Sequence, residues 1–230
     1  MLTVAIIPAR AGSKGLPDKH LRRIGGVPMI AHTVRAALNA RRIDRVLVST
    51  NDPAVARVAE AAGAEVPFRR PAELAADDAP TFPAIRHAVE WLEHRGASVG
   101  LVVTLQPTSP LRRAGQIDAA IALLDDPAVD SAVSVTALDL PISVVGWLER
   151  GIFRPARPPE GDLRRQASPP AVRLTGGIYV TRRSLLATGR LVGDRPAALV
   201  LDAGASIDVD TAVDLAAARR AWRAVKRGRA

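Results

Sequence analysis

The sequence predicts an α/β fold, built on a mostly parallel sheet that has helices on both faces. Apolar segments of strand length alternate with longer amphipathic segments, which is typical of parallel strands joined by helical crossovers. A basic, glycine-rich loop directly follows the first apolar segment, at the place where such sheets bind ligands. The most continuously apolar run covers residues 100–107, so we expect it at the centre of the sheet, buried on both faces.

The first half of the chain supplies a regular series of elements. Residues 2–8 form the first expected strand, and the first helix is expected over 28–40, with a proline at its start. Asn51 or Asp52 is placed to cap a second helix, which Gly63 ends. The other expected elements are strands at 45–50 and 64–68, and a helix at 80–95 that stops at Gly96.

The second half breaks this alternation between residues 139 and 172. Prolines and arginines are dense there, and the segment is too long for an ordinary crossover. We therefore interpret 139–172 as an insert within a single domain that spans residues 1–230. Its apolar stretch 142–148 needs cover, which predicts a dimerisation arm that packs against a second copy of the chain. The other expected elements are a helix at 114–126, strands at 131–138, 176–181 and 197–202, and a short strand at 206–210 that leads into a long terminal helix.

Composition excludes several classes of protein. The 230 residues are 48% hydrophobic, which is enough for one well-buried domain. Cysteine is absent, so there is no disulfide framework, no thiolate nucleophile and no Cys-based metal site. No apolar run approaches the roughly 20 residues that a membrane span needs, and the chain starts directly with a strand. We expect a cytoplasmic protein with no membrane partner.

The net charge of +9 raises the alternative of a nucleic-acid binder. Basic residues are spread along the chain, however, and aromatic residues, which stack on single-stranded bases, make up only 3% of it. We therefore favour anionic small molecules as partners and expect no nucleic acid. A non-enzymatic module that binds anions or nucleic acid stays open as the competing interpretation.

The loop after the first strand carries the strongest functional signal. Gly12 and Gly15 let the backbone turn tightly, while Arg10, Lys14 and Lys19 make the loop cationic. Backbone N–H groups and fixed positive charges together suit a phosphate chain. The loop matches neither the G-x-G-x-x-G pattern nor the Walker pattern, so no dinucleotide site or ordinary ATPase is predicted. The alternative is a surface turn whose basic residues are incidental.

Asp208 and Asp210 form a second candidate site. Side chains spaced by one residue point to the same face of a strand, about 7 Å apart, where two carboxylates can share a divalent cation. Mg²⁺ is the natural choice beside a triphosphate. The alternative is that one carboxylate caps the following helix and the other is merely exposed.

Polar side chains at two further places are candidates for the same edge of the sheet. Gln106 leaves the central strand with an amide that both donates and accepts hydrogen bonds, which suits a base edge or a sugar hydroxyl. Arg164, Arg165 and Arg173 flank the insert, and guanidinium groups match carboxylate and phosphate geometry. Taken alone, such features are more often ordinary loops or solvated faces.

Six motifs point jointly to one family. In order along the chain they read "IIPARAGSKGLPDKHL", "VSTND", "RRPAELAADDA", "LQPTSPLR", "RRQASPPAVRLTGGIYV" and "SIDVDTAVDL". This series resembles that of the CMP-sialic acid synthetases, or N-acylneuraminate cytidylyltransferases, over nearly the whole chain. The resemblance implies a Rossmann-like nucleotidyltransferase that uses CTP and Mg²⁺, and a homodimer in which the insert reaches the partner subunit. It implies transfer of CMP to an acidic 2-keto sugar, an N-acylneuraminate or a related nonulosonic acid, with release of pyrophosphate.

The resemblance also implies a role for each matching residue. The implied nucleotide-binding residues are Ala9, Arg10, Gly12, Ser13, Lys14, Lys19, Arg70 and Thr81. The implied catalytic residues are Arg10, Lys14, Lys19, Asp208 and Asp210, and the two aspartates among them are the implied metal ligands. The implied acceptor-binding residues are Gln106, Arg165, Arg173, Thr175 and Tyr179.

Three residues depart from the pattern of that family. His20 stands where the family usually has Asn, Ser143 where a Lys often stands, and Thr175 where Asn commonly precedes the glycine. Most of these departures fall on the acceptor side, so the CTP half of the site is expected to be intact while the acceptor stays open. A Kdo-like ulosonic acid or a phosphonate is the alternative acceptor.

Overall fold

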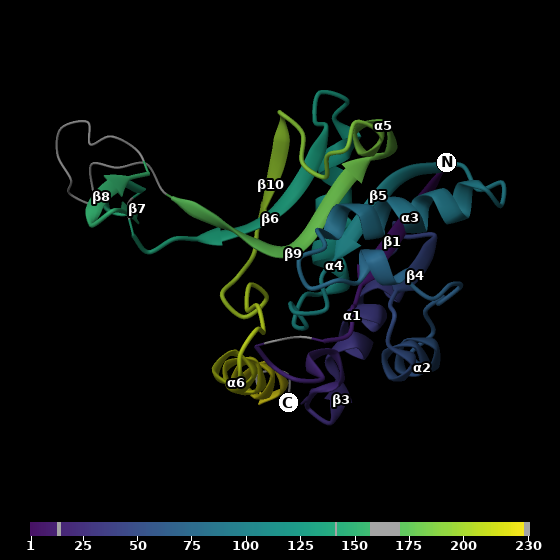
Figure 1. Cartoon of the computed structure of the whole chain (residues 1–230), viewed down its shortest axis with the longest axis horizontal. Helices are drawn as coiled ribbons and strands as arrows, with labels where there is room; N and C mark the ends of the chain where they lie inside the picture. The colour runs from purple at the N-terminus through teal and green to yellow at the C-terminus, as the bar shows by residue number, and fades with distance from the viewer. Residues whose placement is uncertain (13–14, 141, 157–170, 228–230) are drawn as a thin grey trace.

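The structure, a computed structural model, describes residues 1–12, 15–140, 142–156 and 171–227. A six-stranded sheet forms its centre, with the strand order β10-β6-β9-β5-β1-β4 (Figure 1). The strands are β1 (Leu2–Pro8), β4 (Arg45–Ser49), β5 (Val99–Leu105), β6 (Ser131–Ala137), β9 (Val172–Arg182) and β10 (Pro196–Val200). All of them run in one direction except β9, which is antiparallel to its neighbours β5 and β6. The predicted α/β fold with a mostly parallel sheet is confirmed.

Helices cover both faces of the sheet, as predicted. Side chains alternate across β1, so that Ala5 and Ile7 pack under α1, α2 and α4, whereas Val4 and Ile6 pack under α3 and α5. All four side chains are fully buried. The α-helices of these layers are α1 (Met29–Leu38), α2 (Pro53–Ala61), α3 (Thr81–Glu93), α4 (Ala114–Ala122) and α5 (Arg183–Ala187). Short 3₁₀ turns are η1 (Lys19–Leu21), η2 (Ala72–Leu74), η3 (Leu123–Asp125) and η4 (Ile142–Val144).

The central position of β5 is also confirmed. It lies between β1 and β9, and its side chains Val102, Val103 and Leu105 are fully buried. Since helices cover the sheet on both sides, neighbouring residues of β5 are buried on opposite faces, which explains why its sequence is apolar without alternation.

Two adjacent polar residues fix the start of α2 and the course of the first loop. Asp52 caps the helix, because its Oδ1 accepts hydrogen bonds from the backbone N–H groups of Ala54 (2.8 Å) and Val55 (3.3 Å). Asn51 has a different task, since its Oδ1 accepts a hydrogen bond from the backbone N–H of Ala11 at 2.8 Å. The loop that follows β1 is thereby tied to the end of β4.

The short strand predicted at 64–68 is wrong. The segment makes one isolated bridge, at Glu65, and a second isolated bridge follows it at Arg69. Pro67 lies between them and has no N–H group to donate, so a continuous ladder beside β4 is not possible there.

The strand predicted at 206–210 is also wrong. This segment crosses the carboxyl edge of the sheet instead of running beside a strand, and the N–H of Val209 donates to the carbonyl of Thr108 at 2.8 Å. The expected placement of two aspartates on one face of a strand therefore does not apply. Asp208 is half-buried, whereas Asp210 is exposed.

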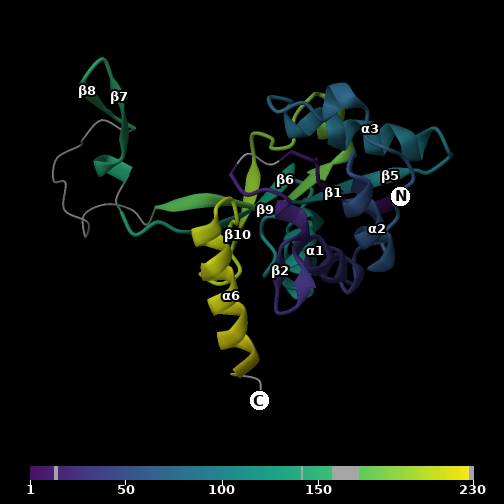
Figure 2. The ribbon, with the colours of Figure 1, turned by 60° about the horizontal axis from the view of Figure 1, so that its bottom comes forward.

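The segment 139–172 leaves the body of the molecule as an arm. Its described part includes β7 (Gly146–Glu149) and β8 (Ile152–Pro155), an antiparallel ribbon that stands away from the sheet beyond β6 and β9 (Figure 2). The apolar side chains of this ribbon are exposed, with Trp147 at 58% and Leu148 at 75%. Residues 157–170 of the segment lie outside the described residues.

The C-terminal helix α6 (Ala212–Arg227) packs beside the first loop. It contacts the small hairpin of β2 (Arg23–Ile24) and β3 (Val27–Pro28), whose turn holds Gly25. A Cβ atom built on Gly25 would lie 2.1 Å from the ring of Trp222, so only glycine lets the helix dock this closely. In the described parts of the chain, no helix is long and apolar enough to cross a membrane.

Candidate active site

A cleft opens at the carboxyl end of the sheet. The strands β1 and β5 are parallel neighbours, so the loops that follow them emerge side by side. The cleft between these loops has a volume of about 320 Å³. It is lined by Pro8, Arg10, Gly15, Lys19, His20, Arg70, Ala79, Pro80, Thr81, Gln106, Pro107, Thr108 and Asp210.

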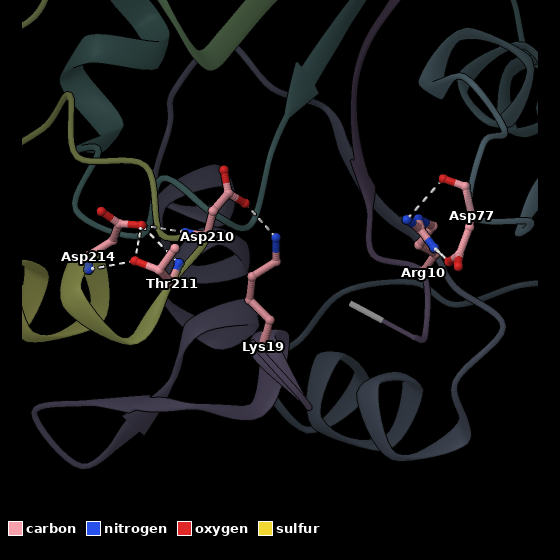
Figure 3. A network of polar contacts seen from close by, with 6 residues as sticks. All are labelled: Arg10, Lys19, Asp77, Asp210, Thr211 and Asp214. Carbon is pink, nitrogen blue, oxygen red and sulfur yellow. Dashed lines mark hydrogen bonds and ion pairs between the residues drawn. The ribbon is translucent and has the colours of Figure 1, made fainter. Parts of the chain in front are cut away.

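Two cations of the cleft are held by carboxylates of the chain itself (Figure 3). Arg10 Nη1 donates to Asp77 Oδ1 at 2.7 Å, and Arg10 Nη2 donates to the backbone carbonyl of Asp77 at 3.3 Å. Lys19 Nζ donates to Asp210 Oδ1 at 2.7 Å. Both cations therefore have fixed positions from which they can meet a negatively charged ligand.

Arg70 is a third cation in the wall of the cleft. Its side chain is buried, and it donates from Nε to Ser49 Oγ at 3.0 Å and from Nη2 to the Ser49 carbonyl at 2.6 Å. Burial and, to a smaller extent, the positive charge of Arg10 together lower the pKa of the Arg70 guanidinium to about 10. Arg70 still carries its charge at neutral pH. Its described hydrogen-bond partners are neutral groups, so an anion in the cleft would be its counterion.

His20 lies buried between these cations. Burial lowers its pKa to about 4, and the neighbouring charge of Lys19 acts in the same direction, so the imidazole is neutral at pH 7. It makes a hydrogen bond to the backbone of Arg10, while its Nδ1 has no partner among the described residues. The ring therefore supports the backbone of the first loop without adding a further positive charge.

Asp208 lies beside Asp210 at the edge of the cleft. Burial raises the pKa of the Asp208 carboxyl, and a hydrogen bond from Thr108 opposes this rise, while the negative charge of Asp210 adds to it. Its Oδ1 is buried and has no hydrogen-bond partner among the described residues. A carboxylate oxygen in this position is suited to bind a cation.

The two aspartates match the protein's share of a magnesium site. Mg²⁺ is commonly bound by one or two carboxylates together with substrate phosphates and water. Within the described residues, no group of three or more His, Cys, Asp or Glu is placed to hold a metal ion. Asp208, whose Oδ1 has no partner among the described residues, and the neighbouring Asp210 would be the two carboxylates available to such an ion.

Sequence reasoning gave no role to Arg112, although it ends the "LQPTSPLR" motif. Its guanidinium is buried, and burial lowers its pKa to about 9, while the negative charge of Asp208 acts in the opposite direction. Its Nη2 donates to the backbone carbonyl of Gln106. Arg112 thereby links the end of β5 to the aspartate segment. The signal available in the sequence was an arginine close behind a fully apolar strand.

Four of the eight predicted nucleotide-binding residues line the cleft. Those that line it are Arg10, Lys19, Arg70 and Thr81. Ala9 does not, because its side chain is fully buried in the core and its N–H donates to the Ser49 carbonyl at 2.9 Å. Gly12 has a φ of 77° and borders a smaller hollow beside the cleft. Ser13, Lys14, Arg164 and Arg165 lie outside the described residues, as does the side chain of Ser143.

The predicted acceptor residues are only partly brought together. Gln106 lines the cleft, whereas Tyr179 does not. Burial raises the pKa of the Tyr179 phenol, and the negative charge of Asp208 acts in the same direction. Thr175 does not reach the cleft, because its side chain is buried and its Oγ1 lies 2.6 Å from the Oγ of Ser134. Arg173 is exposed on β9 at the base of the arm and does not line the cleft.

The fold and the cleft together define a nucleotidyltransferase. The sequence model of one family, described as cytidylyltransferase, matches residues 4–144, which include the first loop and the end of β5. The chain belongs to the cytidylyltransferase family.

Named relatives are similar over nearly the whole of this chain. A CMP-N,N'-diacetyllegionaminic acid synthase of Legionella pneumophila is 31% identical over 94% of each chain. A 3-deoxy-manno-octulosonate cytidylyltransferase of Rhodopseudomonas palustris is 34% identical over 95% of this chain and 96% of its own. An N-acylneuraminate cytidylyltransferase of Escherichia coli O18:K1:H7 is 30% identical over 92% of this chain but only 50% of its own. The resemblance inferred from the six motifs is confirmed.

A solved structure shows the same architecture. A CMP:2-keto-3-deoxy-manno-octonic acid synthetase complexed with CTP superimposes with a TM-score of 0.70, at 23% identity, over 96% of this chain and 98% of that one. Similarity at this level of identity concerns the fold. The predicted Rossmann-like nucleotidyltransferase fold is therefore confirmed.

Proposed function

We propose that the protein transfers CMP from CTP to an acidic 2-keto sugar of the nonulosonic-acid class, with release of pyrophosphate. The observation that carries the proposal is the cleft, where Arg10, Lys19 and Arg70 bring three positive charges to the carboxyl edge of a cytidylyltransferase sheet. A triphosphate is the part of the substrate whose charge matches such a cluster.

The reaction requires positioning and charge neutralisation more than covalent chemistry by the protein. The anomeric hydroxyl of the sugar acid attacks the α-phosphorus of CTP in line, and pyrophosphate leaves with the electrons of the broken P–O bond. The hydroxyl proton passes to solvent. Arg10, Lys19 and Arg70 supply preorganised positive charge where negative charge grows on the departing pyrophosphate.

Mg²⁺ is the proposed cofactor. Asp208 and Asp210 would hold the ion, because they are neighbours and one carboxylate oxygen of Asp208 is buried without a partner among the described residues. When bound, Mg²⁺ supplies further positive charge to the phosphate oxygens. The chain's own part is to present these two carboxylates beside the cleft that Lys19 lines.

The class of the acceptor is supported by the relatives and by the chemistry around the cleft. The names of the three relatives specify diacetyllegionaminic acid, deoxy-manno-octulosonate and acylneuraminate, which are all sugar acids. Gln106 lines the cleft and offers an amide for the sugar. A Kdo-like ulosonic acid is the second candidate, favoured by the 34% identity to the octulosonate enzyme.

We further propose a cytoplasmic homodimer. The exposed apolar ribbon of β7 and β8 would pack against a second subunit, and Arg165 of the arm is a candidate to reach the acceptor in the partner's site. This arrangement would supply a cation on the acceptor side, where Arg173 stays outside the cleft.

A pyrophosphate-release assay tests the proposal. The protein is incubated with Mg²⁺ and CTP, with ATP, GTP and UTP as controls, and with a panel of N-acetylneuraminate, a legionaminic acid, Kdo and a phosphonate. Release is expected with CTP and the nonulosonic acids. Turnover of Kdo alone would show that the acceptor is a Kdo-like ulosonic acid, the second candidate. Absence of CTP-dependent pyrophosphate release with every acid would refute the proposed function.

A further inference from the structure

The guanidinium of Arg10 is occupied on both of its outer nitrogens by one residue. Nη1 meets the carboxylate of Asp77 at 2.7 Å, and Nη2 meets the backbone carbonyl of Asp77 at 3.3 Å. These two nitrogens form the fork with which arginine binds two oxygens of a phosphate. A phosphate that binds Arg10 end-on, through these two nitrogens, must therefore compete with Asp77 for them, whereas the other N–H groups of the guanidinium are not used by these contacts (Figure 3).

The exchange of these partners is not hindered by burial. The side chain of Arg10 is 29% exposed and that of Asp77 is 48% exposed, so both water and a ligand can reach this ion pair. Ion pairs with this exposure contribute little to stability, and a triphosphate with several negative charges competes well for the same arginine. The Arg10–Asp77 ion pair is thus stable enough to hold Arg10 in the free protein and weak enough for a triphosphate to replace Asp77.

The contact also belongs to the wall of the cleft. Asp77 precedes Ala79, Pro80 and Thr81, which line the cleft, and Thr81 begins α3. Arg10 also lies close enough to the buried Arg70 for its positive charge to lower the pKa of Arg70, in addition to the effect of burial. Without the carboxylate of Asp77, both Arg10 and Arg70 would be available to bind the ligand.

We propose that Asp77 is a positioning residue that holds Arg10 as an internal counterion and sets the affinity for the triphosphate by competing with it. The proposal rests on the proposed function for the identity of the ligand, while its geometry concerns any polyphosphate. Asp77 does not touch the reacting atoms. It acts through Arg10, so its effect falls on binding and not on the chemical step.

The test compares two neighbouring aspartates. Asp77→Asn removes the competing charge and keeps the shape of the side chain, whereas Asp78→Asn removes an equal charge from an exposed neighbour that is not a partner of Arg10. Calorimetric Kd values for CTP and for inorganic tripolyphosphate are measured with KM and kcat. Asp77→Asn is expected to lower both Kd values about two- to fivefold with kcat unchanged, and Asp78→Asn to change them less. Asp77→Glu keeps the charge and is expected to behave like the parent protein.

Each outcome decides the matter. If Asp77→Asn and Asp78→Asn change the Kd values equally, the effect of Asp77 is only that of a long-range charge. If Asp77→Asn binds the ligands more weakly, Asp77 only supports Arg10. Either result overturns the proposal. Should Asp77→Asn fail to fold, Asp77→Ala serves as the second neutral variant. If tripolyphosphate binding tightens while CTP gives no turnover with any acid, the counterion role stands and the proposed function fails.

Discussion

Gly15 of the first loop lies against the backbone of Asp210, close enough that a Cβ atom built on Gly15 would be 2.6 Å from the Asp210 carbonyl oxygen. A backbone atom cannot yield as a flexible side chain can. The contact therefore sets the distance between the loop proposed for phosphate binding and the aspartates proposed for the metal. Because Gly15 has no side chain, the first loop can lie directly against the segment of Asp210, which comes from the other end of the chain.

This contact predicts that Gly15→Ala impairs activity more than stability. The added methyl group pushes the two segments apart by up to about 1 Å, and a displacement of that size at a reacting centre costs on the order of a hundredfold in rate. We expect kcat/KM for CTP to fall by that order while the melting temperature changes little. Gly115→Ala is the matched control, because nothing lies within 4 Å of its added Cβ atom in α4. A fully active Gly15→Ala variant would show that the spacing is not critical.

Arg70→Met is expected to lose activity with little change in the free energy of unfolding. The substitution removes a cation from the cleft, which typically costs about a hundredfold in rate. It also loses two hydrogen bonds to Ser49 but relieves the burial of a charge, so stability should change by no more than about 1 kcal/mol. Steady-state kinetics and urea unfolding measure the two effects. Arg69→Met, at an exposed neighbour outside the cleft, should alter neither.

Much of the fold follows from the sequence because its signals are local. The apolar run of β5, the cap Asp52 and the ends at Gly63 and Gly96 depend on residues near one another in the chain. The direction of β9 is different, since the same side-chain alternation serves a strand in either orientation. β9 returns from the arm directly beside β6, and a return of this kind makes the two strands antiparallel.

The sequence predicts only those residues of the site that lie in loops directly after strands. The position of Arg10 and Gln106 at the cleft could be predicted because each follows a buried parallel strand. Asp77 could not be found in this way, since it pairs with a residue 67 positions away and lies in an irregular segment. The buried position of Thr175 could not be predicted, because it depends on the strand register, which places its hydroxyl 2.6 Å from that of Ser134 and which no local pattern reveals.

His20 predicts a dependence of stability on pH. Its folded pKa of about 4 lies below the ordinary value of 6.5, so between these values the unfolded chain binds a proton that the folded chain does not. Stability therefore falls as the pH falls through 6.5 and levels off near 4. The expected loss from this residue between pH 7.5 and 5 is about 2 kcal/mol.

Urea unfolding of the parent protein and of His20→Gln at the two pH values measures this contribution. The difference between pH 7.5 and 5 should be smaller in His20→Gln by the stated amount. His94→Gln is the control, because His94 is exposed on the surface. An identical pH dependence in parent and His20→Gln would mean that the imidazole is not buried in its neutral form.

Asp210→Asn and Asp214→Asn should separate metal binding from stability. Asp210 is 63% exposed in its pair with Lys19, so its loss should change the unfolding free energy by less than about 1 kcal/mol. Asp214 accepts hydrogen bonds from the backbone N–H (2.8 Å) and the hydroxyl (2.7 Å) of Thr211 at the start of α6, and its loss should cost about 1 kcal/mol. Only Asp210→Asn is expected to raise the Mg²⁺ concentration needed for half-maximal turnover.

Calorimetric titration with Mg²⁺ in the presence of CTP gives a second readout that does not depend on turnover. Weaker binding of the ion to the complex is expected for Asp210→Asn and not for Asp214→Asn. The same Mg²⁺ dependence in both variants would remove Asp210 from the proposed metal site.

The exposed ribbon of the arm predicts the effect of Leu148→Asp on assembly. Leu148 is 75% exposed, so a charge there should leave the fold of the subunit intact, whereas in an apolar dimer interface it would have to be buried without a partner. We expect light scattering to show a monomer for this variant and a dimer for the parent protein. Val213→Asp is the matched control, since Val213 is also 75% exposed but lies on α6, away from the arm. A parent protein that is monomeric and fully active would refute the dimer, and a dimeric Leu148→Asp variant would place its interface elsewhere.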